Sequence, residues 1–231
     1  MTTALQLALA TSLVFAWTAS ATKPCHGSWP KPSSCSVSTV QELLLARDFQ
    51  VIREIILEAG TYSLGEKEPS GFYLWRSLTL KAAPGATPIL QRAPTASSKD
   101  LGRVLNIGAS TSSFVEGLVI RGGYVQDHNG AGILNRGNLT LKDCVVTDNV
   151  AHGAPPKEGS GGGIVSVSYE SFNMSVYLTL LNTTVTANQA ANKGGGVFVD
   201  QGTCNTTCSF FNADDNTRVF GNTPDDIYPP P

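Results

Sequence analysis

Side chains capable of acid–base chemistry recur in polar segments between residues 121 and 152 of this 231-residue chain. Asp127 and His128 are adjacent, Asp148 and His152 follow about twenty residues later, and Arg121 precedes both pairs. Carboxylate and imidazole groups transfer protons, and several converging carboxylate oxygens bind Ca²⁺. These residues are therefore the candidates for an acid–base site. Solvated turn residues explain the same positions, and two or three scattered acids are weak evidence for a cation site.

A short glycine signature gives the spacing of the elements that must position these residues. Gly130-Ala-Gly, Gly161-Gly-Gly and Gly194-Gly-Gly are each followed by Ile or Val, and they recur at about thirty-residue intervals. Recurrence at this period is typical of stacked coils or solenoids. The glycines are expected where a corner turns with positive φ. No Lys-Ser/Thr follows them and no βαβ unit surrounds them, so they do not form a phosphate loop.

Aligning the polar turns places apolar residues in columns. Residues two apart on a strand share a face, so two columns are predicted to point into the core. A third column of asparagines is predicted to form a hydrogen-bonded ladder at a corner, because Asn tolerates left-handed φ and its amide can bond a stacked Asn. The first column holds Ile120, Val146, Val185 and Val219, the second holds Leu118, Cys144, Thr183 and Thr217, and the ladder holds Asn149, Asn188 and Asn222.

The sequence predicts three short strands per coil, preceded by one helix. Thr39, with Glu42 three residues later, resembles a capping box and opens a predicted helix over residues 39–47 that covers the first coil. Stacked coils hydrogen-bond each strand to the coils above and below and build one continuous core. The first β segment is expected at 54–57, with further strands at 77–80, 88–90, 104–107, 139–141, 164–167, 178–180 and 197–199.

Several of these segments resemble right-handed β-helix repeat proteins of the pectin lyase-like superfamily. The resemblance is carried by Gly117-Leu-Val-Ile-Arg-Gly-Gly, Gly130-Ala-Gly-Ile-Leu-Asn, Asn138-Leu-Thr-Leu and Gly194-Gly-Gly-Val, and it is closest to the repeats of polymorphic outer membrane proteins. It covers residues 38–228 and implies an all-β, single-stranded right-handed parallel β-helix with a short N-terminal capping helix. The superfamily includes polysaccharide lyases, hydrolases and esterases beside surface proteins without catalysis, so the resemblance specifies fold better than activity.

The hydrolase pattern of the superfamily does not carry over to this chain. It would require a Gly-His-Gly and an Arg-x-Lys motif in successive coils, whereas the chain has Ala151-His-Gly and no Arg-x-Lys. Asp-Asp pairs occur at 214–215 and 225–226, but both fall in the terminal coil. The lyase pattern of the superfamily fits this chain slightly better than the hydrolase pattern. In a lyase, Asp127, His128, Asp148 and Arg121 would serve as acids and base, and Ca²⁺ would be the cofactor. Lys193 is a further basic residue nearby in sequence. No other cofactor is expected.

We expect a non-catalytic binding or structural module that recognises carbohydrate or cell-surface components. Residues 150–161 and 169–177 are predicted to project as loops, and the second is aromatic and suited to sugar stacking, although a packed or glycosylated loop explains it equally. A polysaccharide lyase acting on acidic polysaccharide is the alternative. An ice-binding solenoid is a minor alternative, because Thr140, Thr147, Thr179, Thr184 and Thr186 give partly ordered columns that Arg121 and Arg218 interrupt. The aromatic residues of the second loop are Tyr169, Phe172 and Tyr177.

The N-terminal residues predict an extracellular, secreted or cell-surface location. Residues 4–21 form an uncharged apolar run that ends in Ala-Ser-Ala, which is typical of a cleaved signal peptide over 1–21. No Lys or Arg precedes the run, so an uncleaved anchor is the alternative. A Cys/Pro-rich segment is expected at 22–38, the β-helix domain with its cap at 39–228, and a Pro tail at 229–231.

Charge and hydropathy exclude two classes of partner. The net charge is −2 and the basic residues are scattered, so the chain lacks the basic patch that nucleic-acid binding requires. No second apolar run approaches spanning length, so no membrane span is expected after signal removal. The sequence leaves the oligomeric state open.

Five cysteines and four glycosylation sequons fit an oxidising compartment. Local spacing favours Cys25–Cys35 and Cys204–Cys208 disulfides, although four cysteines permit three connectivities. Cys144 lies in an apolar strand and is expected to be a small buried core residue. No metal site is expected, because the Cys-x₃-Cys has no His or second pair nearby. The glycan acceptors are Asn138, Asn173, Asn182 and Asn205.

Overall fold

The computed structural model describes residues 33–65, 68–93, 102–153, 158–168, 174–200 and 208–229. This part of the chain is mostly β, with parallel strands and one helix. The predicted signal peptide and residues 22–32 of the Cys/Pro-rich segment lie outside it. So do Pro230 and Pro231 of the predicted tail.

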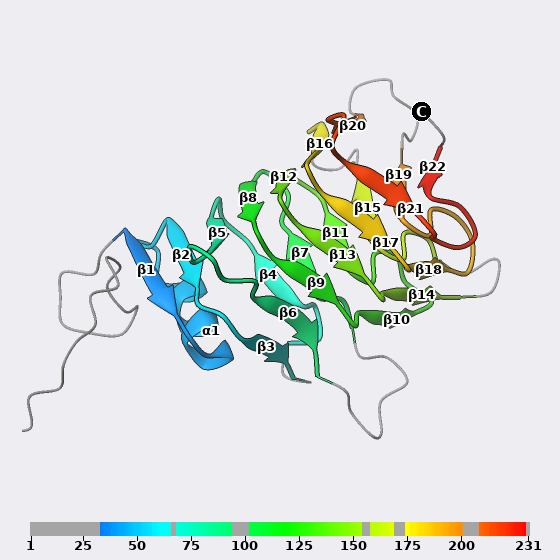
Figure 1. The fold of residues 1–231 in the computed structure, drawn as a ribbon. Helices are drawn as coiled ribbons and strands as arrows, with labels where there is room; N and C mark the ends of the chain where they lie inside the picture. Colours follow the sequence, from blue (N-terminus) through cyan, green and yellow to red (C-terminus); the bar gives the residue numbers. More distant parts are fainter. Residues whose placement is uncertain are drawn as a thin grey trace, which may run out of the picture.

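Each of three long sheets takes one strand from every pass of the chain (Figure 1). All paired strands are parallel. Sheet A contains β1 (Ser34–Val37), β2 (Glu54–Leu57), β5 (Thr79–Ala82), β8 (Ser112–Glu116), β12 (Asn138–Lys142), β16 (Val176–Leu181) and β20 (Ser209–Ala213). Sheet B contains β3 (Thr61–Leu64), β6 (Ile89–Arg92), β9 (Val119–Arg121), β13 (Val145–Thr147), β17 (Thr184–Thr186) and β21 (Arg218–Phe220). Sheet C contains β4 (Phe72–Leu74), β7 (Leu105–Ile107), β11 (Ile133–Asn135), β15 (Ile164–Val167), β19 (Val197–Asp200) and β22 (Ile227–Tyr228).

The chain visits the sheets in the same order, A then B then C, each time. We number the passes as coils 1 to 6, which begin at β2, β5, β8, β12, β16 and β20. Parallel pairing between corresponding strands of successive coils is compatible with an all-β parallel solenoid. In Figure 1 the coils follow one another along the molecule.

A fourth sheet was not expected from the sequence. Sheet D contains β10 (Tyr124–Gln126), β14 (Val150–His152) and β18 (Gln189–Ala190), and it lies between sheets B and C in coils 3 to 5. Residues 150–152 were predicted to begin a projecting loop, which is wrong because Val125, Ala131 and Ala151 form a small buried cluster there. One buried residue per three-residue strand is too short a pattern to detect in a sequence.

The N-terminal end of the stack is covered by α1 (Val40–Asp48), as predicted. The capping box is confirmed: the Glu42 backbone N–H donates to Thr39 Oγ1 and the Thr39 N–H donates to Glu42 Oε2, each at 3.2 Å. The guanidinium of Arg76 donates to the carbonyl oxygens of Arg47 and Phe49, which holds the last turn of the helix.

Strand β1 corrects the expectation that the first β segment lies at 54–57. Its residues pair with β2 in register, and Cys35 and Val37 point into the core while Ser34 and Ser36 do not. Buried and partly exposed residues alternate along β1, but serine and cysteine differ little in hydropathy, so the sequence pattern does not reveal the strand. The predicted strands at 77–80, 88–90 and 104–107 are found one or two residues later in the chain.

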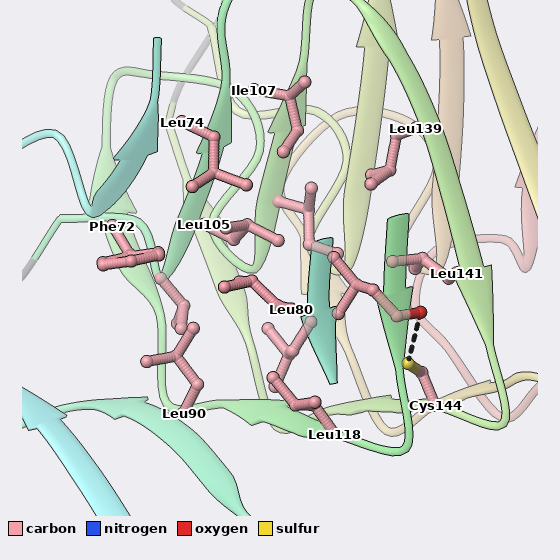
Figure 2. Packing of buried hydrophobic residues seen from close by; sticks show 14 of the residues in the cluster. Phe72, Leu74, Leu80, Leu90, Leu105, Ile107, Leu118, Leu139, Leu141 and Cys144 are labelled. Atoms are coloured by element: carbon pink, nitrogen blue, oxygen red, sulfur yellow. Dashed lines mark hydrogen bonds between the residues drawn. The ribbon is translucent and has the colours of Figure 1, made fainter. Parts of the chain in front are cut away.

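The register of sheet B and the burial of their members confirm the predicted core columns in coils 3 to 5, whereas in coil 6 Val219 and Thr217 are only partly buried. Ile120 pairs with Val146, and Val146 with Val185, and all three side chains are fully buried. Figure 2 shows the surrounding cluster, in which Cys144 lies near Leu141 of β12 and Leu118, the residue before β9. The Cys144 thiol donates to the Val115 carbonyl oxygen at 3.5 Å, and burial raises the pKa of Cys144 to about 11.

The predicted asparagine ladder is also confirmed. Asn149 Nδ2 donates to Asn188 Oδ1 at 2.9 Å, and Asn188 Nδ2 donates to Asn222 Oδ1 at 3.0 Å. Asn222 Nδ2 donates in turn to Asp226 Oδ1 at 2.9 Å. In coil 3 the ladder position is Gly123, whose backbone N–H donates to Asn149 Oδ1 at 2.9 Å. A Cβ at Gly123 would collide with the Ala131 carbonyl oxygen, so only glycine fits there.

Corners between sheets require left-handed backbone. The signature glycines Gly130, Gly161 and Gly194 have φ of 72°, 66° and 61°, as predicted. Four corner residues of the Asp/Asn type also have positive φ, which these side chains tolerate better than most. They are Asp127, Asp143, Asp148 and Asn182, with φ from 46° to 58°.

Candidate functional site

Sheet D separates the predicted acid–base residues into two groups. Arg121 ends β9 and Asp148 precedes β14, so both lie at the start of this sheet. Asp127 and His128 follow β10 and His152 ends β14, so these three lie at its far end. A strand rises about 3.3 Å per residue, which puts Asp148 and His152 roughly 13 Å apart along the backbone. The structure therefore brings Asp127 together with His152, but not with Asp148 or Arg121.

The contacts of these residues are those of turn side chains. Arg121 Nε donates to Gln91 Oε1 at 3.0 Å, and Asp148 Oδ2 accepts from Thr147 Oγ1 at 3.1 Å. The Asp127 backbone N–H donates to the His152 carbonyl oxygen at 2.7 Å. Lys193 Nζ lies 3.1 Å from Tyr228 Oη. Within the described ranges, no three His, Cys, Asp or Glu side chains group closely enough to hold a metal ion.

A groove of about 400 Å³ crosses the outer face of sheet A. Its walls are formed by β5, β8 and β12 and by the residues that precede β2 and β5. Most of the described lining residues carry a hydroxyl or an amide, and Arg53 is the one ionisable side chain that the described part of the chain contributes. The lining residues are Arg53, Ser77, Leu78, Thr79, Ser112, Ser113, Phe114, Asn138 and Thr140.

Register extends the groove onto two exposed aromatic rings. Ser112 pairs with Asn138, Asn138 with Tyr177, and Tyr177 with Phe210, so these residues form one outward row across coils 3 to 6. The rings of Tyr177 and Phe210 are stacked, with centroids 4.9 Å apart and planes at 17°. Their exposed fractions are 47% and 46%, which is unusual for rings of this size. We call this stacked pair the aromatic platform.

Charges beside the groove are paired with one another. Lys142 Nζ lies 2.6 Å from Glu116 Oε1. That hydrogen bond raises the pKa of Lys142. The flank of the groove therefore presents a neutralised ion pair, and the described polar side chains that line the groove are neutral except for Arg53.

A smaller cavity of about 220 Å³ lies over the outer face of sheet C. Leu134, Val165 and Val167 are buried and form its floor with Phe198. His128 Nδ1 is 3.9 Å from Glu158 Oε2 at the rim, and both side chains are 61% exposed. The remaining rim residues are Arg103, Asn129 and Asp200.

Sequence reasoning found part of the aromatic platform and missed the rest. Tyr177 was expected in a projecting aromatic loop, whereas it lies in β16; the loop's other aromatic residues, Tyr169 and Phe172, lie outside the described residues. Phe210 was not singled out, because its neighbour in space is 33 residues away in sequence and only the strand register joins them. The threonine columns are two residues deep: Thr147 pairs with Thr186, and Arg121 and Phe220 flank that pair.

Two of the four sequons can be placed. Asn138 is exposed in the groove, and Asn182 lies at the corner between β16 and β17, where its Nδ2 donates to Asp143 Oδ1 at 2.6 Å. Asn173 and Asn205 lie outside the described residues, as do Cys25 and Cys204. Cys35 is disulfide-bonded, and its pairing with Cys25 stays a prediction. Cys208 is not disulfide-bonded, which counts against the predicted Cys204–Cys208 pair.

The chain matches no protein-family model, no curated protein and no solved structure. In the described part of the chain, no helix is both long enough and apolar enough to cross a membrane. The function must therefore be argued from the groove and the cavity themselves.

Proposed function

We propose that the protein is an extracellular, non-catalytic carbohydrate-binding module built on a right-handed parallel β-helix similar to those of the pectin lyase-like superfamily. The right hand is supported by the general preference for right-handed connections between parallel strands of one sheet. The predicted signal peptide supports the location. The ligand site is the groove of sheet A together with the aromatic platform.

The observation that carries the proposal is the continuity of the groove with the platform. Hydroxyl and amide groups such as those of Ser112, Asn138 and Thr140 can donate to and accept from sugar hydroxyls. The Tyr177 and Phe210 rings face each other, so each has one remaining face on which the apolar face of a sugar ring can stack. Neighbouring strands lie about 4.8 Å apart, so the polar groups recur at short, regular intervals along the groove. An unbranched chain of sugars that runs along the stack would meet one strand after another.

The groove is equipped for binding and not for cleavage. Hydrolysis of a glycosidic bond ordinarily uses two carboxyl groups that flank it. Among the described residues that line the groove there is no Asp, Glu or His. Glu116 stands at the flank, where its carboxylate is paired with Lys142. The ligand should therefore be released intact.

Binding to a panel of neutral and acidic polysaccharides, measured by affinity electrophoresis and calorimetry, tests the proposal. The Tyr177→Ala, Phe210→Ala double variant should lose at least about tenfold in affinity, because central aromatic contacts dominate binding energies. Phe220→Ala is the matched control, since Phe220 is 51% exposed but lies on sheet B. A protein that binds no member of the panel, or a double variant that binds as well as the control, contradicts the proposal.

The second candidate is a lyase acting on acidic polysaccharide, with Asp127, His128, Asp148 and Arg121 as the site and Ca²⁺ as the cofactor. Its support is the cavity over sheet C, where His128 and Glu158 face each other beside Arg103. The described residues separate Asp148 from His128, which counts against a single site. Formation of unsaturated products with and without Ca²⁺, lost in Asp148→Ala, would favour this candidate over the first.

A further inference from the structure

Asn138 is a glycosylation sequon inside the proposed binding groove. Asn138 and Thr140, the first and third residues of the Asn-Leu-Thr sequon, both line the groove. The Asn138 side chain is exposed, and its Nδ2 lies 3.4 Å from Ser112 Oγ in the neighbouring strand. On the other side, Asn138 pairs in register with Tyr177 of the aromatic platform. A group attached to Asn138 would therefore lie between the polar part of the groove and the platform.

We propose that an N-linked glycan on Asn138 occupies the sheet A groove and closes it to other carbohydrate. The inference rests on the proposed function, because the glycan uses the same hydroxyl, amide and aromatic groups as the external ligand. It identifies a modification site that regulates binding. Glycosylated protein is closed, and protein without this glycan is open.

The modification itself follows ordinary glycosyl-transfer chemistry. Asn138 Nδ2 forms a bond to the anomeric carbon of a sugar carried on a lipid diphosphate. The bond between that carbon and the diphosphate oxygen breaks, the lipid diphosphate leaves, and the amide nitrogen gives up one of its two protons. One N–H remains on Asn138, which can still donate to Ser112.

The position of Asn138 decides what the glycan covers. Adjacent strands are about 4.8 Å apart, so the first sugar reaches the Tyr177 ring on one side or Ser112 on the other. Ser77 extends the second path, because its hydroxyl accepts from the Ser112 backbone N–H at 2.9 Å. Whether the glycan extends toward Tyr177 or toward Ser112 and Ser77, it fills space that an external carbohydrate ligand would need.

Asn182 provides a matched comparison within the same chain. Its sequon lies at a corner between sheets A and B, and neither Asn182 nor Thr184 lines the groove. A glycan at Asn182 therefore leaves the groove accessible. Any effect specific to Asn138 can be separated from a general effect of glycosylation.

The test compares wild-type protein secreted from a eukaryotic host with the same chain made in bacteria. Mass spectrometry should find Asn138 occupied in the secreted protein, and its affinity for the polysaccharide ligand should be at least about tenfold weaker. Asn138→Gln from the eukaryotic host should bind more tightly than glycosylated wild type from that host. Thr184→Ala, which removes the Asn182 sequon, should leave the affinity of the glycosylated protein unchanged.

Nitration of Tyr177 gives a readout that does not depend on any external ligand. The ring is about half exposed in the bare chain, so a glycan over it should slow its nitration in the secreted protein. An unmodified Asn138, or equal nitration and equal binding with and without the glycan, would overturn the inference. If bacterial protein binds no polysaccharide while the glycan still protects Tyr177, the proposed function fails and the closure of the groove stands.

Discussion

Coil 1 and coils 4 to 6 stack in the same way but are stabilised by different interactions. The fully buried aromatic side chains of the described residues, Tyr62 and Phe72, both lie in coil 1. In the described part of the chain the buried polar side chains all come later, from Arg92 onward, and those of coils 4 to 6 include Asn149, Asn188 and Thr183. The backbone ladder is thus compatible with a core filled by apolar volume or by hydrogen-bonded columns.

Single columns show the change from one kind of core to the other. In sheet C, Leu74 pairs with Ile107, Ile107 with Asn135, and Asn135 with Ser166. Asn135 Nδ2 donates to Ser166 Oγ at 3.1 Å, and both side chains are fully buried. A buried amide without such a partner would cost about 1–3 kcal/mol, so the polar coils depend on every member of a column being present.

Phe72→Ala should cause the largest loss of stability. It removes a fully buried ring from coil 1, and such substitutions cost roughly 3–5 kcal/mol of unfolding free energy. Urea unfolding followed by circular dichroism measures the loss. Phe220→Ala, at an exposed ring, should change the free energy by less than about 0.5 kcal/mol. A loss below about 1 kcal/mol for Phe72→Ala would mean that coil 1 does not depend on apolar volume.

Asn188→Ala should cost about 2–3 kcal/mol, because it leaves buried groups on both neighbouring coils unpaired. The Asn149 backbone N–H and side-chain amide would lose their shared acceptor. Asn188→Leu is the informative companion, since it keeps the volume and removes the hydrogen bonds. Equal losses of unfolding free energy in the two variants indicate that hydrogen bonds stabilise this column. If leucine restores the stability, the column depends on apolar volume, as coil 1 does.

Stability should fall at alkaline pH through Tyr62. Burial raises the pKa of Tyr62 to about 12, and its hydroxyl donates to the Val37 carbonyl oxygen at 2.7 Å. The folded state keeps its proton where the unfolded chain, near pKa 10, has lost it. This contribution is therefore complete below pH 10 and is lost as the pH rises toward 12, by about 1 kcal/mol at pH 11. Urea midpoints from pH 8 to 11 measure the effect.

Tyr62→Phe should weaken this pH dependence without abolishing it. The remainder would belong to Cys144 in coil 4, whose raised pKa of about 11 acts in the same direction. If the urea midpoint of Tyr62→Phe falls with pH as steeply as that of wild type, Tyr62 does not cause the loss of stability.

Ala187→Gly should give the smallest effect, a gain of about 0.5–1 kcal/mol. Ala187 has φ of 55°, a conformation that an alanine side chain disfavours. The equivalent corner residues in neighbouring coils are Gly122, Asp148 and Gly221, all with positive φ. Ala151→Gly, at a buried strand position, should instead lower the thermal midpoint. A loss on Ala187→Gly would show that the alanine methyl makes a packing contact worth more than the strain.

The sequence predicts this fold where chemistry repeats from coil to coil. The Ile120 column, the asparagine ladder and the signature glycines recur with the same residue type at the same phase, so they could be aligned. Sheet D has no such repeat, because Val125, Ala151 and Ala190 share little beyond small size. Strand β1 was missed for a similar reason, since its inward residues are separated by serines.

The candidate site was less predictable than the fold. Acids and histidines can be recognised by residue type, but whether they converge depends on the length and direction of sheet D. Most of the described residues that line the groove are serines, threonines and asparagine, which are also the common residues of turns. They line up with Tyr177 and Phe210 only through the pairing of strands from different coils, and this pairing cannot be read from any one segment of the sequence.

The asparagine ladder also has a direction. Each Asn amide in it donates one N–H to the next acceptor of the series and another to a carbonyl oxygen of the preceding coil. The hydrogen bonds of the series itself therefore run one way, from Gly123 to Asp226, and strengthen one another. A carboxylate can accept at the end of such a series without needing an acceptor of its own. Asp226 lies in the same coil as Asn222 and accepts from both its backbone N–H and its side-chain amide, so the series ends on this carboxylate.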